Sequence, residues 1–65
     1  MLRLKEILDQ KQLTQVWLSD AIGVSVVSVN NWCRQKNEPS LKTLSTIAKV
    51  LNVRIADLIK EENSK

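Results

Sequence analysis

The chain has 65 residues, is 43% hydrophobic and 26% charged, and carries a formal net charge of +3, which allows one small domain with a single core. It contains no histidine, one glycine and one cysteine, which excludes most catalytic bases and zinc sites, glycine-rich nucleotide loops and an intramolecular disulfide. From these residue counts we expect a protein that has no metal or cofactor and is not an enzyme. No apolar run approaches the length of a membrane span, so we also expect the protein to be soluble and cytoplasmic, without a membrane partner.

Two short helices are predicted in the first third of the chain. Apolar residues at helical spacing predict one helix from Leu2 to about Lys11 and another from Gln15 to about Ile22. Thr14 is a suitable N-cap for the second helix, because its hydroxyl can accept a hydrogen bond from an orphan backbone N–H. Gly23 should end that helix, because glycine adopts a positive φ at little cost.

A third helix is predicted from Val26 to about Gln35, with Ser25 as its N-cap. Its valine-rich start could also form a β-strand, but the rest of the sequence offers no second strand to pair with it. Val29 and Trp32 have the spacing of one helical face. We therefore predict a helix that these two side chains anchor in the core.

Two further helices are predicted in the second half of the chain. Ser40 is a suitable N-cap for a fourth helix with a regular apolar stripe from Leu41 to Leu51. Asn52 can end this helix in the left-handed conformation. The apolar residues from Val53 to Ile59 predict a short final helix.

These elements predict an all-α fold, with one compact five-helix domain over residues 1–60 and a flexible polar tail over residues 61–65. No repeat, linker or low-complexity segment divides the chain. The predicted core consists of the apolar residues that recur at helical spacing, namely Leu4, Ile7, Leu18, Ile22, Leu44, Ile47 and Leu51.

The connection between the second and third helices is the most informative segment. Ile22-Gly23-Val24-Ser25 places a glycine between an apolar residue and a serine cap, and such a tight turn sets two helices at a steep angle. No acidic residue occurs from Ala21 to Asn37, and Arg34 and Lys36 lie near the end of that stretch. A polyanion would therefore approach the middle of the chain most easily.

Several short motifs occur in a fixed order along the chain: Leu13-Thr14-Gln15, Leu18, Ile22-Gly23-Val24-Ser25, Val29, Trp32, Pro39-Ser40-Leu41, Leu44, Ile47-Ala48-Lys49 and Leu51-Asn52-Val53. In this order they resemble the Cro/C1-type helix-turn-helix family, which includes phage repressors, restriction–modification controller proteins and antitoxins. The resemblance covers roughly residues 2–59. It implies a five-helix, lambda-repressor-like domain with a helix-turn-helix that binds duplex DNA, usually as a two-fold dimer, and regulates transcription.

The resemblance places Val26, Val27 and Asn31 at positions that approach bases, with Asn30 beside them. Asparagine can bond both N6 and N7 of adenine, whereas valine can contact only a thymine methyl, so we expect an A·T-biased site. Gln15 matches a family position that bonds phosphate and braces the recognition helix. The full set of predicted phosphate contacts is Gln15, Ser25, Ser28, Arg34, Lys36, Asn37 and Lys42.

Double-stranded DNA is thus the expected partner, bound by a homodimer that forms in solution or only on DNA. We expect Arg54, Ile55 and Ile59 at the dimer interface, because they should lie at the edge of the core. The alternative is an antitoxin or adaptor that acts mainly through protein contacts. Trp17 and the last helix would then be its apolar anchors.

Several positions depart from the family pattern, and two of them, Gln12 and Gln35, stand where the family often has glycine. Cys33 also has two interpretations. The neighbouring Arg34 could lower its pKa and make the thiol reactive. Alternatively, Cys33 is a small packing residue on a helix.

Overall fold

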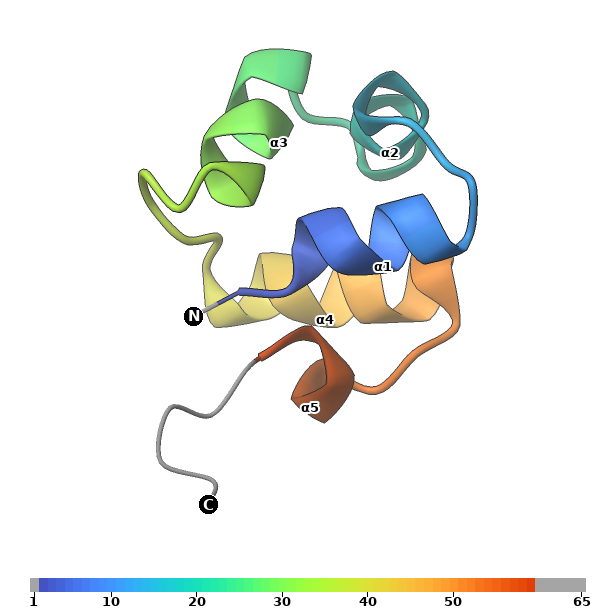
Figure 1. Cartoon of the computed structure of the whole chain (residues 1–65). Helices are drawn as coiled ribbons and strands as arrows, with labels where there is room; N and C mark the ends of the chain where they lie inside the picture. The colour runs from blue at the N-terminus through green and yellow to red at the C-terminus, as the bar shows by residue number, and fades with distance from the viewer. Residues whose placement is uncertain (1, 60–65) are drawn as a thin grey trace.

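The computed structural model of the chain describes residues 2–59, in which five helices are joined by short connections. The helices are α1 (Leu4–Gln10), α2 (Gln15–Ile22), α3 (Val26–Cys33), α4 (Leu41–Leu51) and α5 (Ile55–Leu58). Figure 1 shows α2 and α3 together on one side of α1, with α4 and α5 on the other. The all-α prediction is confirmed for this part of the chain, and the predicted tail over residues 61–65 lies outside the described residues.

Side-chain caps start three of the helices at the predicted positions. Thr14, Ser25 and Ser40 each accept a hydrogen bond from the backbone N–H three residues later, at 3.0, 3.2 and 3.2 Å. Each bond satisfies one of the N–H groups that the first helical turn leaves without a partner, and such a cap contributes about 1 kcal/mol. These short helices therefore begin where local chemistry places them.

Left-handed residues end several of the helices. Gly23 (φ 76°) and Asn52 (φ 60°) follow α2 and α4, as predicted. Gln12 (φ 60°) and Gln35 (φ 64°) adopt the same conformation after α1 and α3, although a side chain makes it unfavourable. Both glutamines stand where the resembled family often has glycine, the residue that adopts this conformation at least cost.

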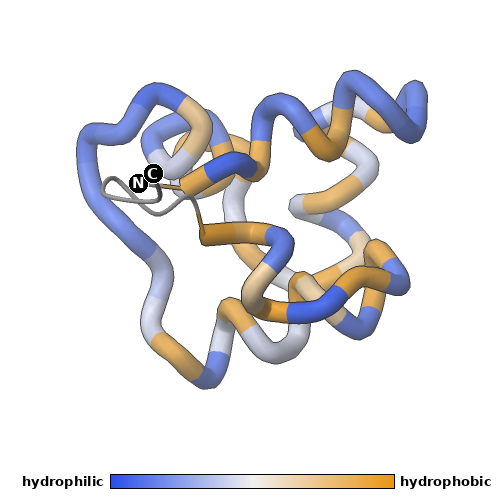
Figure 2. Tube along the Cα trace, turned by 60° about the horizontal axis from the view of Figure 1, so that its bottom comes forward, coloured by the Kyte–Doolittle hydropathy of each residue, from blue (hydrophilic) through white to orange (hydrophobic). Residues whose placement is uncertain are grey.

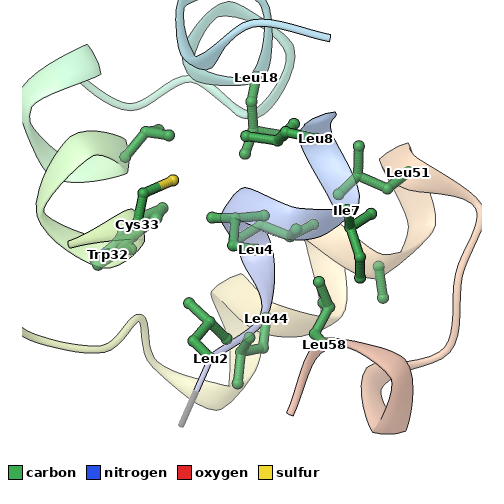
Figure 3. Close-up of a cluster of buried hydrophobic side chains, with 13 residues drawn as sticks. Leu2, Leu4, Ile7, Leu8, Leu18, Trp32, Cys33, Leu44, Leu51 and Leu58 are labelled. Atoms are coloured by element: carbon green, nitrogen blue, oxygen red, sulfur yellow. The ribbon is translucent and has the colours of Figure 1, made fainter. Parts of the chain in front are cut away.

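Buried apolar side chains from all five helices form one core. Leu4, Leu18, Val29, Ile47 and Leu58 are completely buried. Figure 3 shows the α1 side chains in the middle of this cluster, with α3 contributing from one side and α4 and α5 from the other. Apolar and polar positions alternate along the tube in Figure 2, as expected for helices that each bury one face.

Two residues of the predicted apolar stripes lie elsewhere. Ile22, predicted as core, is only partly buried at the end of α2 and packs against the core from outside. Leu41 is 71% exposed, because it is the first residue of α4 and precedes the part of that helix that the other elements cover. The remaining predicted core residues are buried.

Contacts with distant residues make α1 and α3 shorter than predicted. Leu2 does not join α1; it forms an isolated antiparallel bridge with Ile59, and the Arg3 N–H donates to the Leu58 carbonyl at 2.7 Å. At the end of α3, the Gln35 amide donates to the Leu2 carbonyl at 2.7 Å and accepts from the Leu2 N–H at 3.3 Å. The segment before α1 therefore connects the end of α3 to the end of α5.

The two left-handed glutamines give a test of this connection. We expect Gln12→Gly to leave the free energy of unfolding unchanged or raise it by up to about 1 kcal/mol, because glycine relieves the left-handed backbone but adds freedom to the unfolded chain. Gln35→Gly gains the same relief and loses two hydrogen bonds, each worth about 0.5–1.5 kcal/mol. Urea unfolding should therefore find Gln35→Gly less stable than Gln12→Gly. Equal stability of the two variants would show that the Gln35–Leu2 contact contributes nothing.

Candidate nucleic-acid interface

The turn between α2 and α3 is fixed by backbone hydrogen bonds. The Gly23 and Val24 N–H groups both donate to the Ser19 carbonyl, at 2.9 and 3.0 Å. The Ser19 side chain is itself buried, and its hydroxyl donates to the Val16 carbonyl at 2.8 Å. With Gly23 left-handed and Ser25 capping the next helix, the chain leaves α2 and enters α3 in one defined direction.

Burial divides α3 into an inner and an outer face. Val29 is completely buried and Trp32 nearly so, which confirms their predicted anchoring role. Each residue advances about 100° around a helix, so Val27 lies about 200° from Val29 and faces away from the core. Val27 is 65% exposed and Val26, at the flank, is 40% exposed. In Figure 1 the first turn of α3 lies at the outer end of the domain, away from α4 and α5.

A hydrogen bond between side chains joins the two helices. The Asn30 amide donates to the Gln15 side-chain oxygen at 3.1 Å, and both residues are half-buried. The structure thus brings together a predicted phosphate contact and a predicted base contact, and the bond braces α3 against the start of α2. Among the described residues, none accepts a hydrogen bond from the Gln15 amide N–H groups, which leaves them able to donate to a phosphate.

The serines of the first turn of α3 interact with each other. The Ser25 hydroxyl accepts from the Ser28 N–H and donates to the Ser28 hydroxyl, both at 3.2 Å. Ser25 is exposed and Ser28 half-buried. Asn31 is also half-buried, and its side-chain amide has no hydrogen-bond partner within residues 2–59.

The predicted cationic contacts gather after α3. Arg34, Lys36 and Asn37 lie in the exposed connection from α3 to α4, and Lys42 is exposed in the first turn of α4. The ion pairs of the described residues involve Arg3, Lys5 and Arg54, and none includes Arg34, Lys36 or Lys42. These three cations are therefore available to a polyanion.

The predicted dimer residues differ in their surroundings. Arg54 is exposed, with its Nε 3.7 Å from an Asp57 carboxylate oxygen. Ile55 is partly buried and packs against the core, so it contributes to the fold more than the sequence suggests. Ile59 is exposed beside a depression of about 190 Å³, which Leu2, Glu38, Pro39 and Leu44 also line.

The reactive interpretation of Cys33 is wrong, and the packing interpretation is confirmed. The Cys33 side chain lies in the core beside α1 (Figure 3). Burial raises the pKa of the Cys33 thiol; Lys5 lowers this pKa and Asp9 raises it, both to a smaller extent. Arg34 follows Cys33 in the sequence but is not among the charges that shift this pKa.

Sequence reasoning missed the Gln35–Leu2 contact and the exposure of Leu41. One signal in the sequence could have indicated the Gln35–Leu2 contact. Gln35 stands where the resembled family often has glycine. No group of histidine, cysteine or acidic side chains within residues 2–59 could hold a metal ion. In the same part of the chain, no helix has the length and apolar character needed to cross a bilayer.

Comparisons with known proteins agree with this geometry. The sequence pattern of the helix-turn-helix family matches residues 4–58. The chain is also similar to the crystal structure of a proposed DNA-binding protein from Bacteroides fragilis, with 38% sequence identity and a TM-score of 0.89. That match covers 92% of this chain and 97% of the other. No match was found among curated proteins.

The burial of Cys33 predicts slow reaction with thiol reagents. We expect native Cys33 to react with iodoacetamide at pH 8 at least tenfold more slowly than the urea-unfolded chain, because the thiolate forms less readily in the core. Mass spectrometry would follow the modification. Equal rates in the two states would contradict the burial.

The same pKa shift predicts a dependence of stability on pH. Above the ordinary thiol pKa, about 8.5, the unfolded chain loses the Cys33 proton while the folded chain retains it. Because the unfolded state then binds fewer protons, the contribution of Cys33 to stability falls as pH rises further. Urea unfolding at several pH values between 8 and 10 should show that the free energy of unfolding falls less with pH in Cys33→Ala than in the parent chain.

Proposed function

Because the chain belongs to the Cro/C1-type helix-turn-helix family, we propose that it is a sequence-specific duplex-DNA-binding protein that regulates transcription as a repressor or controller. The observation that carries this proposal is the exposed first turn of α3, followed by cations that form no ion pair within residues 2–59. A similar protein that was proposed to bind DNA adds support.

In this proposal α3 is the recognition helix and enters the major groove with its N-terminal turn leading. The residues assigned to base edges are Val26, Val27, Asn30 and Asn31. One Asn30 amide N–H already donates to Gln15, so Asn30 holds Gln15 in place. Asn30 can then contact bases only through its second amide N–H and its side-chain oxygen. Asn31, whose amide has no partner in the described chain, is the principal hydrogen-bonding reader.

The phosphate contacts then lie on both sides of α3. Gln15 lies at the start of α2 and the two serines at the start of α3, whereas the cations follow α3. The complete set assigned to phosphates is Gln15, Ser25, Ser28, Arg34, Lys36, Asn37 and Lys42. Such contacts fix the register and much of the affinity, and they carry little sequence information.

We propose a homodimer on DNA, with Arg54 and Ile59 at its centre and Ile55 supporting them from the core side. Two-fold symmetry would set the recognition helices about 34 Å apart, one turn of B-DNA, and would favour a near-palindromic operator. The proposed activity is binding without catalysis or cofactor, in the cytoplasm.

The second candidate is a protein-binding adaptor or antitoxin. Val16 (58% exposed) and Trp17 (39% exposed) on α2 favour it, because they offer apolar surface to a partner. Capture of a protein partner would survive high salt, whereas DNA binding should weaken.

Selection of bound duplexes from a random DNA pool, followed by footprinting at 50 and 200 mM salt, tests the function directly. We expect an enriched, near-palindromic, A·T-biased sequence and a footprint that weakens at the higher salt concentration. Failure to enrich any sequence would overturn the proposal.

Asn31→Ala tests the assigned base reader on the selected operator. We expect a loss of about 1–3 kcal/mol in binding and relaxed preference at one base pair, because the bidentate bond to adenine disappears. Fluorescence anisotropy on the operator and on single-base variants measures both effects. Undiminished discrimination at every base pair would remove Asn31 from the recognition set.

Lys36→Ala tests the phosphate assignment. We expect weaker binding to all sequences by a similar factor and a slope of log affinity against log salt that is about one unit shallower, because one phosphate contact is lost. Lys49→Ala is the matched control, since Lys49 is also exposed but lies in the last turn of α4. The assignment is wrong if Lys36→Ala and Lys49→Ala give the same slope.

A further inference from the structure

A depression in the surface between α1 and α5 takes no part in the proposed function. Its volume is about 420 Å³, within the range of roughly 300–1,000 Å³ that is typical of small-molecule sites. The lining comes from both helices and the residues next to them, namely Arg3, Ile7, Gln10, Lys11, Val53 and Asp57. None of these residues is assigned to DNA or to the dimer contact, and α5 lies on the side of α1 opposite to α3 (Figure 1). A ligand bound here would therefore leave the proposed recognition surface exposed.

The charged side chains of the depression have hydrogen-bonding groups to spare. The Arg3 Nε donates to Glu6 at 2.9 Å, and the two Nη groups of Arg3 have no partner within residues 2–59. Lys11 is exposed and takes part in no ion pair of the same residues. Asp57 interacts with Arg54 through its Oδ2 atom alone, at 3.1 Å from the backbone N and 3.7 Å from Nε. The depression thus offers cationic donors together with the free Oδ1 atom of one carboxylate.

Two branched apolar side chains complete the lining. Ile7 is only 5% exposed and belongs to the core, and Val53 is half-buried and packs against it. A hydrocarbon group placed against them would be removed from water without covering a polar group that needs hydration. The depression therefore combines a small apolar surface with charges of both signs.

We propose that this depression binds a free amino acid with a branched apolar side chain. The ligand carboxylate accepts hydrogen bonds from Arg3 and Lys11, and the ligand ammonium group donates to Asp57 Oδ1. The ligand side chain lies against Ile7 and Val53. A simple carboxylate would bring a second negative charge close to Asp57, and a simple amine would meet two cations. A zwitterion provides a partner for each charge.

Backbone contacts fix the two sides of the depression relative to each other. The Arg3 N–H donates to the Leu58 carbonyl at 2.7 Å, and Asp57 is the residue before Leu58. The cations of α1 and the carboxylate of α5 are therefore held in place before any ligand arrives, which lowers the entropy lost on binding. A ligand that contacts both sides binds the folded chain and not the unfolded one, so it also raises the Tm.

Titration of the isotope-labelled chain with L-leucine, followed in two-dimensional amide NMR spectra, tests the binding directly. We expect saturable shifts at Arg3, Lys11 and Asp57, no shift at Asn31, and a dissociation constant on the order of 1 mM. Two analogues test the zwitterion: isocaproate is leucine without its amino group, and leucinamide carries no carboxylate. Each should bind about tenfold more weakly than L-leucine, because each loses a charge-assisted hydrogen bond.

Variants connect each analogue to one side chain. Lys11→Gln should weaken the binding of L-leucine about fivefold and leave that of leucinamide unchanged, because leucinamide has no carboxylate for Lys11. Asp57→Asn should weaken L-leucine to a similar extent without weakening isocaproate, and the asparagine oxygen can still accept from the Arg54 N–H. Lys49→Gln is the matched control, because Lys49 is exposed and unpaired within residues 2–59 but does not line the depression.

Three results would contradict the proposed site. The first is the absence of saturable shifts at Arg3, Lys11 and Asp57 when L-leucine is about tenfold above the expected dissociation constant. The second is equal affinity for L-leucine, isocaproate and leucinamide, and the third is an equal loss of affinity in Lys11→Gln and Lys49→Gln. Because these measurements contain no DNA, they can fail while the proposed function holds, and they can succeed if it does not.

Discussion

The burial of Val29 and Trp32 in the core is the interaction on which the proposed recognition surface depends. Both side chains come from α3, and their burial fixes the rotation of that helix about its axis. A rotation of one residue, about 100°, would bury Val27 or Val26 and expose a different set of groups. The core therefore determines which side chains α3 presents, although none of the core residues belongs to the surface. Substitutions at Val29 or Trp32 would change both stability and recognition for this reason.

Two hydrogen-bonded connections hold α3 in addition to the core. Gln15 bonds Asn30 within the helix-turn-helix, and Gln35 bonds the backbone of Leu2 at the end of α3. Since Leu2 also forms the bridge with Ile59, the end of α3 is connected to the region proposed for the dimer contact. A helix held at several points loses less conformational entropy when it docks, which favours affinity without any further contact.

Local signals in the sequence were sufficient for most of the fold. The start of α2, α3 and α4 and the ends of α2 and α4 follow from a capping hydroxyl or a left-handed residue, both of which act within four residues of the chain. The start of α1 and the end of α3 could not be predicted in this way, because Gln35 and Leu2 are 33 positions apart in the sequence. Similarly, adjacency to Arg34 suggested a reactive Cys33, whereas burial, a property of the folded state, determines its pKa. The predicted base contacts and Gln15 were located by family resemblance, whereas Arg34 and Lys36 were also indicated by the stretch without acidic residues in which they lie. The structure added which of the predicted contact residues already bond each other.

In the proposed complex, the separation of cations from apolar side chains along α3 would assign affinity and specificity to different residues. Cations lie beyond the end of the helix, whereas valines occupy its leading turn. Contacts to phosphates release counterions, so their contribution to affinity falls as salt concentration rises, for specific and non-specific DNA alike. Burial of a methyl group against valine releases no ion. Deoxyuridine lacks the C5 methyl group of thymine. As the salt concentration rises, the affinities for operators with thymine and with deoxyuridine should therefore both fall while their ratio stays constant. A ratio that approached one at high salt would assign the discrimination to charged groups instead.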